Sequence, residues 1–91
     1  MKKIIKTTQF KKDYKRYKND KDKLIALYRI IKLLENDIPI PEEYKPHKLM
    51  GNYKGHWECH IENDYLLIWF DKNTNTVALV RLGTHSELFR K

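Results

Sequence analysis

The sequence has only one cysteine, three glycines and three prolines among its 91 residues. Because a disulfide needs two thiols, Cys59 cannot form a bridge within the chain, and a disulfide-stapled secreted domain would normally carry an even set. The glycines and prolines are scattered, and no internal repeat or low-complexity linker is present. We therefore expect one compact domain over residues 1–91, in a reducing compartment.

Long apolar runs are also missing. The longest, Leu66 to Phe70, is far shorter than the roughly 20 residues that a membrane-spanning helix needs. Near the N-terminus only Ile4 and Ile5 separate the lysines, which is too short for the apolar region of a signal peptide. These absences predict a soluble, cytoplasmic protein that has no membrane segment.

Positive charge dominates the first third of the chain. Residues 1–32 hold twelve Lys or Arg and three acids, a net charge of +9, whereas the remaining residues sum to −2. Such a block suits a phosphate backbone, because neutralising phosphates releases counterions, and it equally suits an acidic partner. It is also typical of a solvated helix face that keeps a protein soluble. Charge alone leaves these alternatives open.

The first half of the chain has the periodicity of two helices after a short strand at Ile4 and Ile5. Thr7 or Thr8 is expected to cap the first helix, and Asp20 the second, which ends after Asn36. The first helix has an aromatic stripe of Phe10, Tyr14 and Tyr17. The expected buried stripe of the second consists of Leu24, Leu27, Tyr28, Ile31 and Leu34, widened by Ile25, Ile30 and Leu33.

From Tyr53 onward the period changes to two, which predicts strands. One side of the first strand carries Trp57, Cys59 and Ile61, and the other carries His56, Glu58 and His60. Tyr65 to Phe70 is expected to be a central strand covered on both faces, and Val77 to Leu82 the last strand. Thr84 to Phe89 is expected to be a short turn or helical tail. The order β-αα-βββ predicts an α+β fold, with a helical hairpin packed on a small, mainly antiparallel sheet.

All four histidines, His47, His56, His60 and His85, lie in the C-terminal half of the chain. An imidazole titrates near neutral pH, so two histidines that flank a phosphodiester can serve as general acid and general base. RNA supplies its own nucleophile in the 2′-hydroxyl, so this chemistry suits a ribonuclease. The alternative for any one of them is an ordinary surface or capping histidine.

A metal site is the competing use of these histidines. His56 and His60 are four residues apart, which brings imidazoles together on a helix but separates them by roughly 13 Å on a strand. The sequence has no His-Glu-x-x-His pattern, no cysteine pair and no glycine-rich phosphate loop. Cys59, between Trp57 and Ile61, is expected to be a small core residue rather than a nucleophile. We therefore expect no metal or other cofactor.

Four stretches of the C-terminal half are more specific than these patterns. They are His47-Lys-Leu-Met-Gly51, Glu58-Cys-His-Ile61, Asp64-Tyr-Leu-Leu-Ile68 and Val80-Arg-Leu-Gly-Thr-His-Ser-Glu-Leu-Phe89. In order and spacing, above all in the closing Arg-x-Gly-Thr-His-x-x-Leu-Phe, they resemble the YafQ-type toxins of the RelE superfamily. The resemblance covers nearly the whole chain, and the β-αα-βββ order agrees with the RelE-like fold of that family.

The resemblance implies the toxin of a bacterial type II toxin-antitoxin module. Such a toxin enters the ribosomal A site and cleaves translated mRNA as an endoribonuclease. Its expected partners are the ribosome, mRNA and a cognate antitoxin that silences it in a hetero-oligomer.

The resemblance also implies which residues act. The family's catalytic positions map onto His47, His60, Asp64, Arg81 and His85, and the expected substrate-binding residues are Tyr65, Phe89, Lys48 and Lys54. His56 matches no catalytic position and is expected on the polar surface of its strand. Tyr65 stands where some relatives have Trp, and Asn63 where a Pro is frequent. Tyr65 is expected either to stack on a base or to pack within its strand.

The implied reaction needs no metal. One group removes the 2′-hydroxyl proton, the oxygen attacks phosphorus in line, and another group protonates the departing 5′-oxygen. The family's pattern assigns the acid to His85 and leaves His47, His60 and Asp64 as candidates for the base. Asp64 could instead only orient a histidine. Arg81 would neutralise the phosphorane oxygens through its planar fork of donors.

Two other functions are compatible with the fold. Some members of the wider superfamily inhibit DNA gyrase, and a simple RNA-binding module would use only the basic helices. Neither needs His47, Asp64 and His85 together, so the joint presence of these residues favours the ribonuclease.

Overall fold

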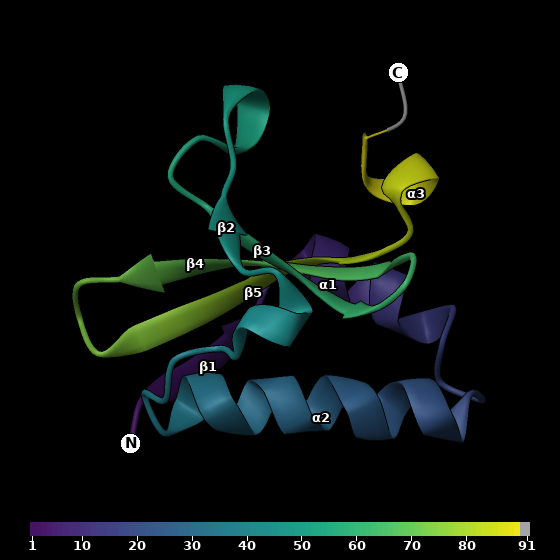
Figure 1. Cartoon of the computed structure of the whole chain (residues 1–91), viewed down its shortest axis with the longest axis horizontal. Helices are drawn as coiled ribbons and strands as arrows, with labels where there is room; N and C mark the ends of the chain where they lie inside the picture. Colours follow the sequence, from purple (N-terminus) through teal and green to yellow (C-terminus); the bar gives the residue numbers. More distant parts are fainter. Residues whose placement is uncertain (90–91) are drawn as a thin grey trace.

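The structure, a computed structural model, describes residues 1–89 and contains a five-stranded sheet (Figure 1). The strands are β1 (Lys3–Lys6), β2 (His47–Lys48), β3 (Trp57–Glu62), β4 (Tyr65–Lys72) and β5 (Thr76–Gly83). Their order across the sheet is β1-β5-β4-β3-β2. Only β1 and β5 are parallel neighbours, and every other adjacent pair is antiparallel. The predicted α+β fold with a mainly antiparallel sheet is confirmed.

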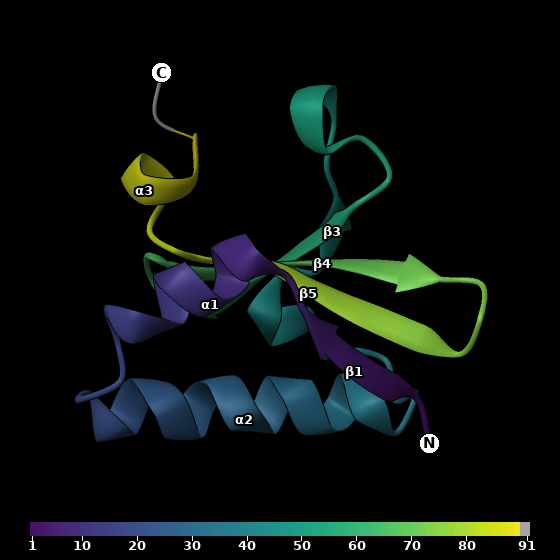
Figure 2. The same cartoon turned by 180° about the vertical axis from the view of Figure 1, so that it is seen from behind.

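Three α-helices are described: α1 (Thr8–Lys15), α2 (Lys21–Glu35) and α3 (His85–Phe89). Both predicted caps are present, since Thr7 Oγ1 accepts a hydrogen bond from Phe10 N and Asp20 Oδ1 accepts one from Lys23 N. Figures 1 and 2 show α2 on one side of the sheet and α3 on the other. No helix within residues 1–89 is long and apolar enough to cross a membrane.

The main core lies between the sheet and the first two helices. Leu27, Ile30 and Leu34 of α2 are buried against β3, β4 and β5. Ile25 and Tyr28, which we expected in the buried stripe, are 52% and 47% exposed, so that part of the prediction is wrong. At about 100° per residue, Ile25 lies roughly 160° around α2 from Leu27. The sheet covers only one side of the helix.

The start of the second predicted strand differs from the expectation. A 3₁₀ turn spans Gly51–Tyr53, and β3 begins only at Trp57. Gly51 and Gly55 have φ values of 70° and 89°, a left-handed region that glycine adopts without steric cost and that interrupts an extended strand. The two-residue β2, which no periodicity had indicated, pairs with β3 instead.

A β-bulge in β5 decides which side chains face α3. Ile68 pairs with Arg81 and Trp69 pairs with Leu79, so Val80 is an extra residue in β5. Leu79 belongs to the main core, whereas Val80 packs with Ile68 and with Leu88 of α3 in a second cluster. A bulge of this kind turns the following side chain to the other face. Arg81 therefore lies on the same face as its partner Ile68, opposite α2.

Candidate active site

Three of the four histidines come together on the face of the sheet that carries α3. His47 belongs to β2, His60 to β3, and His85 begins α3. The ring centroids of His47 and His60 are 6.4 Å apart, and those of His60 and His85 are 5.7 Å apart. Residues from three separate elements thus form one histidine cluster, which we define as His47, His60 and His85.

Asp64, in the turn between β3 and β4, holds His85. Its Oδ1 accepts hydrogen bonds from the backbone N and from Nδ1 of His85, each at 2.9 Å. These two bonds lower the pKa of the Asp64 carboxyl below its ordinary value. Because a carboxylate only accepts, the proton of a neutral His85 ring is on Nδ1. Nε2 is left as the nitrogen that can exchange a proton.

Glu58 is a member of the site that the sequence reasoning did not single out. Its side chain is 3% exposed, and its Oε1 lies 3.2 Å from Nε2 of His47. Its other oxygen has no hydrogen-bond partner among the described residues. Nδ1 of His47 is 2.9 Å from the carbonyl oxygen of Lys45. Side chains alternate between the two faces along β3, and this places Glu58 on the same face as His60. That pattern, which is visible in the sequence, could have indicated Glu58.

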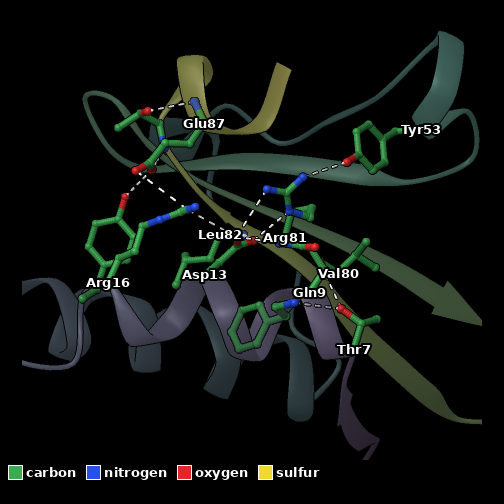
Figure 3. Close-up of polar contacts among 12 residues, drawn as sticks. Thr7, Gln9, Asp13, Arg16, Tyr53, Val80, Arg81, Leu82 and Glu87 are labelled. Carbon is green, nitrogen blue, oxygen red and sulfur yellow. Dashed lines mark hydrogen bonds and ion pairs between the residues drawn. The ribbon is translucent and has the colours of Figure 1, made fainter. Parts of the chain in front are cut away.

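Arg81 of β5 is held on two sides. Its Nε donates to Oδ2 of Asp13 at 2.8 Å, and its Nη1 donates to the Tyr53 hydroxyl at 3.2 Å (Figure 3). The bond to Asp13 is the main cause of a raised Arg81 pKa, although partial burial opposes it. Asp13 was not among the predicted site residues. Its spacing from Phe10 and Tyr17 in the aromatic stripe indicates a buried position.

Aromatic side chains border the cluster. The Phe89 ring is 6.1 Å from the His85 ring and 6.0 Å, edge on, from the Tyr53 ring. Phe89 is 41% exposed, so one side of its ring faces solvent. An open hollow of about 560 Å³ is lined by His85, Ser86, Glu87 and Phe89. Phe89 therefore lies beside the histidines, where a base of the substrate could contact it.

Tyr65 does not lie on the open face with the histidines. It is 1% exposed, its ring is 4.9 Å from the Tyr17 ring, and Nζ of Lys23 lies 4.6 Å from the ring centroid. Burial also raises the pKa of its hydroxyl. A ring covered in this way offers no face to a base, so of the two alternatives for Tyr65 the structure favours packing within the strand.

Of the two expected substrate lysines, Lys48 lies on the face of the sheet away from the cluster. Lys48 follows His47 in β2, pairs with Trp57, and places its Nζ 5.6 Å from a Trp57 ring centroid. It is therefore on the opposite face from His47. Lys54 is exposed, and no hydrogen bond or ion pair joins it to the histidines within residues 1–89.

His56 and Cys59 both pack against other side chains. His56 lies before β3, its ring is 4.9 Å from the Phe70 ring, and its Nδ1 is buried without a partner among the described residues. His56 is half-buried and precedes β3, so it packs on Phe70 and does not lie on the polar side of that strand as expected. Cys59 is fully buried, and burial raises the pKa of its thiol to about 12. Its predicted core role is confirmed.

Glu58, His60 and His85 form the one group in residues 1–89 that could hold a metal ion. One candidate ligand atom from each lies within 4.8 Å of the others. We expected no metal from the sequence, because His56 and His60 are far apart on a strand, but this group joins His60 to Glu58 and His85 instead. Nitrogen and carboxylate donors of this kind suit zinc or copper. A metal ion bound there would occupy ring nitrogens of the same histidines that could transfer protons.

Comparisons with known proteins agree on one family. The profile of a family described as a bacterial toxin of the type II toxin-antitoxin system, YafQ, matches residues 2–90. The chain is 37% identical over 82 residues to the mRNA interferase toxin YafQ of Escherichia coli K12, which covers 89% of this chain and 88% of that protein.

Two solved structures have the same fold. A metal-bound toxin from Helicobacter pylori is 40% identical with a TM-score of 0.84, and the match covers 98% of this chain and 100% of the other. A chain of the E. coli DinJ-YafQ toxin-antitoxin complex is 32% identical with a TM-score of 0.84, and the match covers 97% of both chains.

Proposed function

The chain belongs to the YafQ family of bacterial type II toxins, and we propose that it is an endoribonuclease that cuts translated mRNA by acid-base catalysis. The observation that carries this proposal is the histidine cluster, with His85 oriented by Asp64 and with Arg81 on the same face of the sheet. Curated relatives bear the name mRNA interferase, which agrees with this chemistry.

The substrate provides the nucleophile in the proposed reaction. A base accepts the 2′-hydroxyl proton, the O2′–P bond forms, the P–O5′ bond breaks, and an acid gives a proton to O5′. The products are a 2′,3′-cyclic phosphate and a 5′-hydroxyl end. No water enters the step, and the protein needs only two proton-transfer groups and a source of positive charge.

We assign the acid to His85. Since its Nδ1 is bonded to Asp64, its Nε2 is the nitrogen that can carry the transferable proton. Asp64 accepts two hydrogen bonds from His85, one from its backbone N and one from its ring. This supports an orienting role for Asp64 rather than the role of the base.

We assign the base to His60. Both ring nitrogens of His47 face oxygen acceptors, Lys45 O and Glu58 Oε1, so neither is free to accept the 2′-hydroxyl proton. No hydrogen bond engages the ring of His60 within the described part of the chain. His60 also lies between the other two imidazoles, within reach of a phosphodiester that they flank.

Arg81 and Phe89 complete the proposed site. Arg81 would neutralise charge on the phosphorane oxygens through the donors that Asp13 and Tyr53 do not use. Phe89 would stack on a base of the mRNA, a contact typically worth about 1 to 3 kcal/mol in single-strand recognition. Lys54 would contact phosphates further along the strand.

A metal ion at Glu58, His60 and His85 is a second candidate use of the site, favoured by the proximity of their ligand atoms. A similar toxin from H. pylori is described as metal-bound. Such an ion could act as a Lewis acid or only block the imidazoles. We propose that it blocks them, because His60 and His85 cannot transfer protons through nitrogens that bind a metal. Added zinc or copper should therefore inhibit cleavage, and a chelator should leave it unchanged.

We also propose that a cognate antitoxin silences the toxin, as the solved DinJ-YafQ complex suggests by analogy. A surface that is both strongly basic and reactive suits an acidic partner segment. The ribosome would present the mRNA, and the basic residues of positions 1–32 would contact ribosomal RNA. The place of action would then be the cytoplasm, where translation takes place.

The decisive experiment measures single-turnover cleavage of mRNA on programmed ribosomes by His85→Ala. Loss of a placed proton donor typically costs about 10² to 10⁴ in rate, and ribosome binding should persist because the acid acts in the transition state. His56→Ala is the matched control and should cost little. The cleaved ends should carry a 2′,3′-cyclic phosphate.

The dependence of the cleavage rate on pH then tests the base. The wild-type rate should fall at acidic pH, because the base becomes protonated. His60→Ala should abolish this fall, whereas His47→Ala should retain it. Near-wild-type cleavage by a folded His85→Ala protein, or loss of cleavage with chelator, would contradict the metal-free histidine mechanism. Ribosome binding without any cleaved product from the wild-type protein would favour the non-catalytic alternatives.

A further inference from the structure

The most deeply buried charge in residues 1–89 lies behind the proposed site. Asp13 of α1 is 0% exposed, and Figure 3 shows it between α1 and β5. Its carboxylate accepts hydrogen bonds from Arg81 Nε at 2.8 Å, Arg81 Nη2 at 3.3 Å and Leu82 N at 3.0 Å. A carboxylate withdrawn from water in this way is strongly destabilising unless it is paired. Asp13 and Arg81 therefore fix each other.

The pairing leaves a defined part of Arg81 unused. A guanidinium has five N–H donors. Asp13 takes one on Nε and one on Nη2, and the Tyr53 hydroxyl takes one on Nη1. Two donors remain, one on each terminal nitrogen. The Arg81 side chain is 15% exposed, so these are the donors that a phosphate on the open face could reach.

Asp13 also fixes the backbone that carries Arg81. Its bond to Leu82 N lies directly after the β-bulge that turns Arg81 toward the face of the histidines. The carboxylate thus holds the strand and the guanidinium at once. An arginine side chain without such contacts has many rotamers, and ordering it costs conformational entropy.

We propose that Asp13 is a positioning residue for cleavage, which aims the two remaining donors of Arg81 at the scissile phosphate. This inference rests on the proposed function, in which Arg81 stabilises the phosphorane. Asp13 itself does not contact the substrate. Its contribution is preorganisation, because donors fixed in advance need not be ordered as charge develops on the oxygens.

Asp13→Asn tests the proposal while keeping the shape of the side chain. Its amide oxygen can still accept from Leu82 N, but the charge that holds Arg81 is lost. A misplacement of about 1 Å can cost about 10²-fold in rate, so the single-turnover rate at saturating ribosomes should fall by roughly 10- to 100-fold. The concentration of ribosomes at half-saturation should not change. Gln9→Ala, which removes only the 3.3 Å contact of a neutral side chain to Asp13, should keep the wild-type rate.

A double-mutant cycle separates positioning from a general loss of structure. If Asp13 acts through Arg81, adding Asp13→Asn to Arg81→Ala should not lower the cleavage rate any further. A full additional loss in that background would overturn the proposal. So would near-wild-type cleavage by Asp13→Asn when Arg81→Ala is slow. Wild-type cleavage by Arg81→Ala would instead contradict the role given to Arg81 in the proposed function.

A measurement on the wild-type protein keeps the test independent of how Asp13→Asn folds. Arg81 Nε lies 2.8 Å from a buried oxygen of Asp13, so its proton should give a discrete NMR signal that exchanges slowly with water. An Arg81 Nε proton that exchanges as fast as those of exposed arginines would contradict the pairing on which the proposal depends.

Discussion

Asp64 shows how one exposed carboxylate controls a neighbouring imidazole. It is bonded to both the backbone and the ring of His85, and its folded pKa lies below the ordinary value of 3.8. A depressed carboxyl pKa means that the ionised form stabilises the folded state. That contribution is complete above the ordinary value and is lost as the pH falls through the lowered folded pKa.

Asp64→Asn should change both the stability and the activity of the protein. The wild type should have the higher thermal midpoint above about pH 5, and the difference should shrink as the pH falls below about 4, as linkage requires. Cleavage should also slow, by less than in His85→Ala, because Nε2 remains but Nδ1 is no longer held by a charge. Thermal scans of both proteins from pH 2 to pH 7 check the first part. If the difference in thermal midpoint grew as the pH fell, ionised Asp64 would not be stabilising the folded state.

At the scale of the elements, α2 is held to the sheet by a single narrow stripe. Leu27 and Ile30 are fully buried, while Ile25 and Tyr28 on the outer side are about half exposed. The histidine cluster lies on the opposite face of the same sheet. The packing of α2 therefore supports the site only indirectly, through the strands that carry His60 and Arg81.

The prediction for α2 compares two substitutions on the same helix. Leu27→Ala should lower the free energy of unfolding by about 2 to 5 kcal/mol, because it leaves a cavity in the core. Ile25→Ala should change it by less than about 0.5 kcal/mol, because that side chain is exposed. Urea unfolding of both variants gives the two values. Equal losses would mean that something other than the sheet covers Ile25.

α3 depends on different contacts. Tyr17 donates a hydrogen bond to Glu87 at 2.6 Å, and the same Glu87 oxygen accepts from Thr84 N at 2.9 Å. At Gly83, where φ is 152°, a side chain would collide with Glu87. The connection between α1 and α2 thus fixes the short helix that begins with His85, and Gly83 permits its close approach.

At the scale of the whole molecule, positive charge and chemistry are separated along the chain. Residues 1–32 carry a net charge of +9, and Lys11, Lys12 and Lys15 are exposed on α1. The histidines come instead from β2, β3 and α3. A surface of this kind can attract a large polyanion while the cluster acts on one phosphodiester.

The prediction for the molecule concerns these three lysines. Replacing Lys11, Lys12 and Lys15 together by Gln should weaken ribosome association and flatten its dependence on salt. The slope of log K against log salt should fall by about 0.7 to 0.9 for each phosphate no longer neutralised. Binding titrations at several salt concentrations measure it. An unchanged slope would mean that the lysines only solvate α1.

Local patterns in the sequence were enough to predict most of the elements and most of the residues of the site. Periods of 3.6 and 2 and the capping residues are local properties of the chain, and they gave both long helices and the C-terminal strands. The spaced motifs indicated His47, His60, Asp64, Arg81 and His85, and the structure brings these residues to one face of the sheet.

Which polar side chains are withdrawn from water, and what holds them, depends on contacts between distant parts of the chain. Asp13 and Arg81 are 68 residues apart in sequence, and no local pattern links them. A single extra residue in β5 decides the face on which Arg81 lies, because side chains alternate along a strand and a shift of one residue reverses them. Glu58 is buried, and Tyr65 is covered by Tyr17 and Lys23, because burial depends on what other elements pack above a strand.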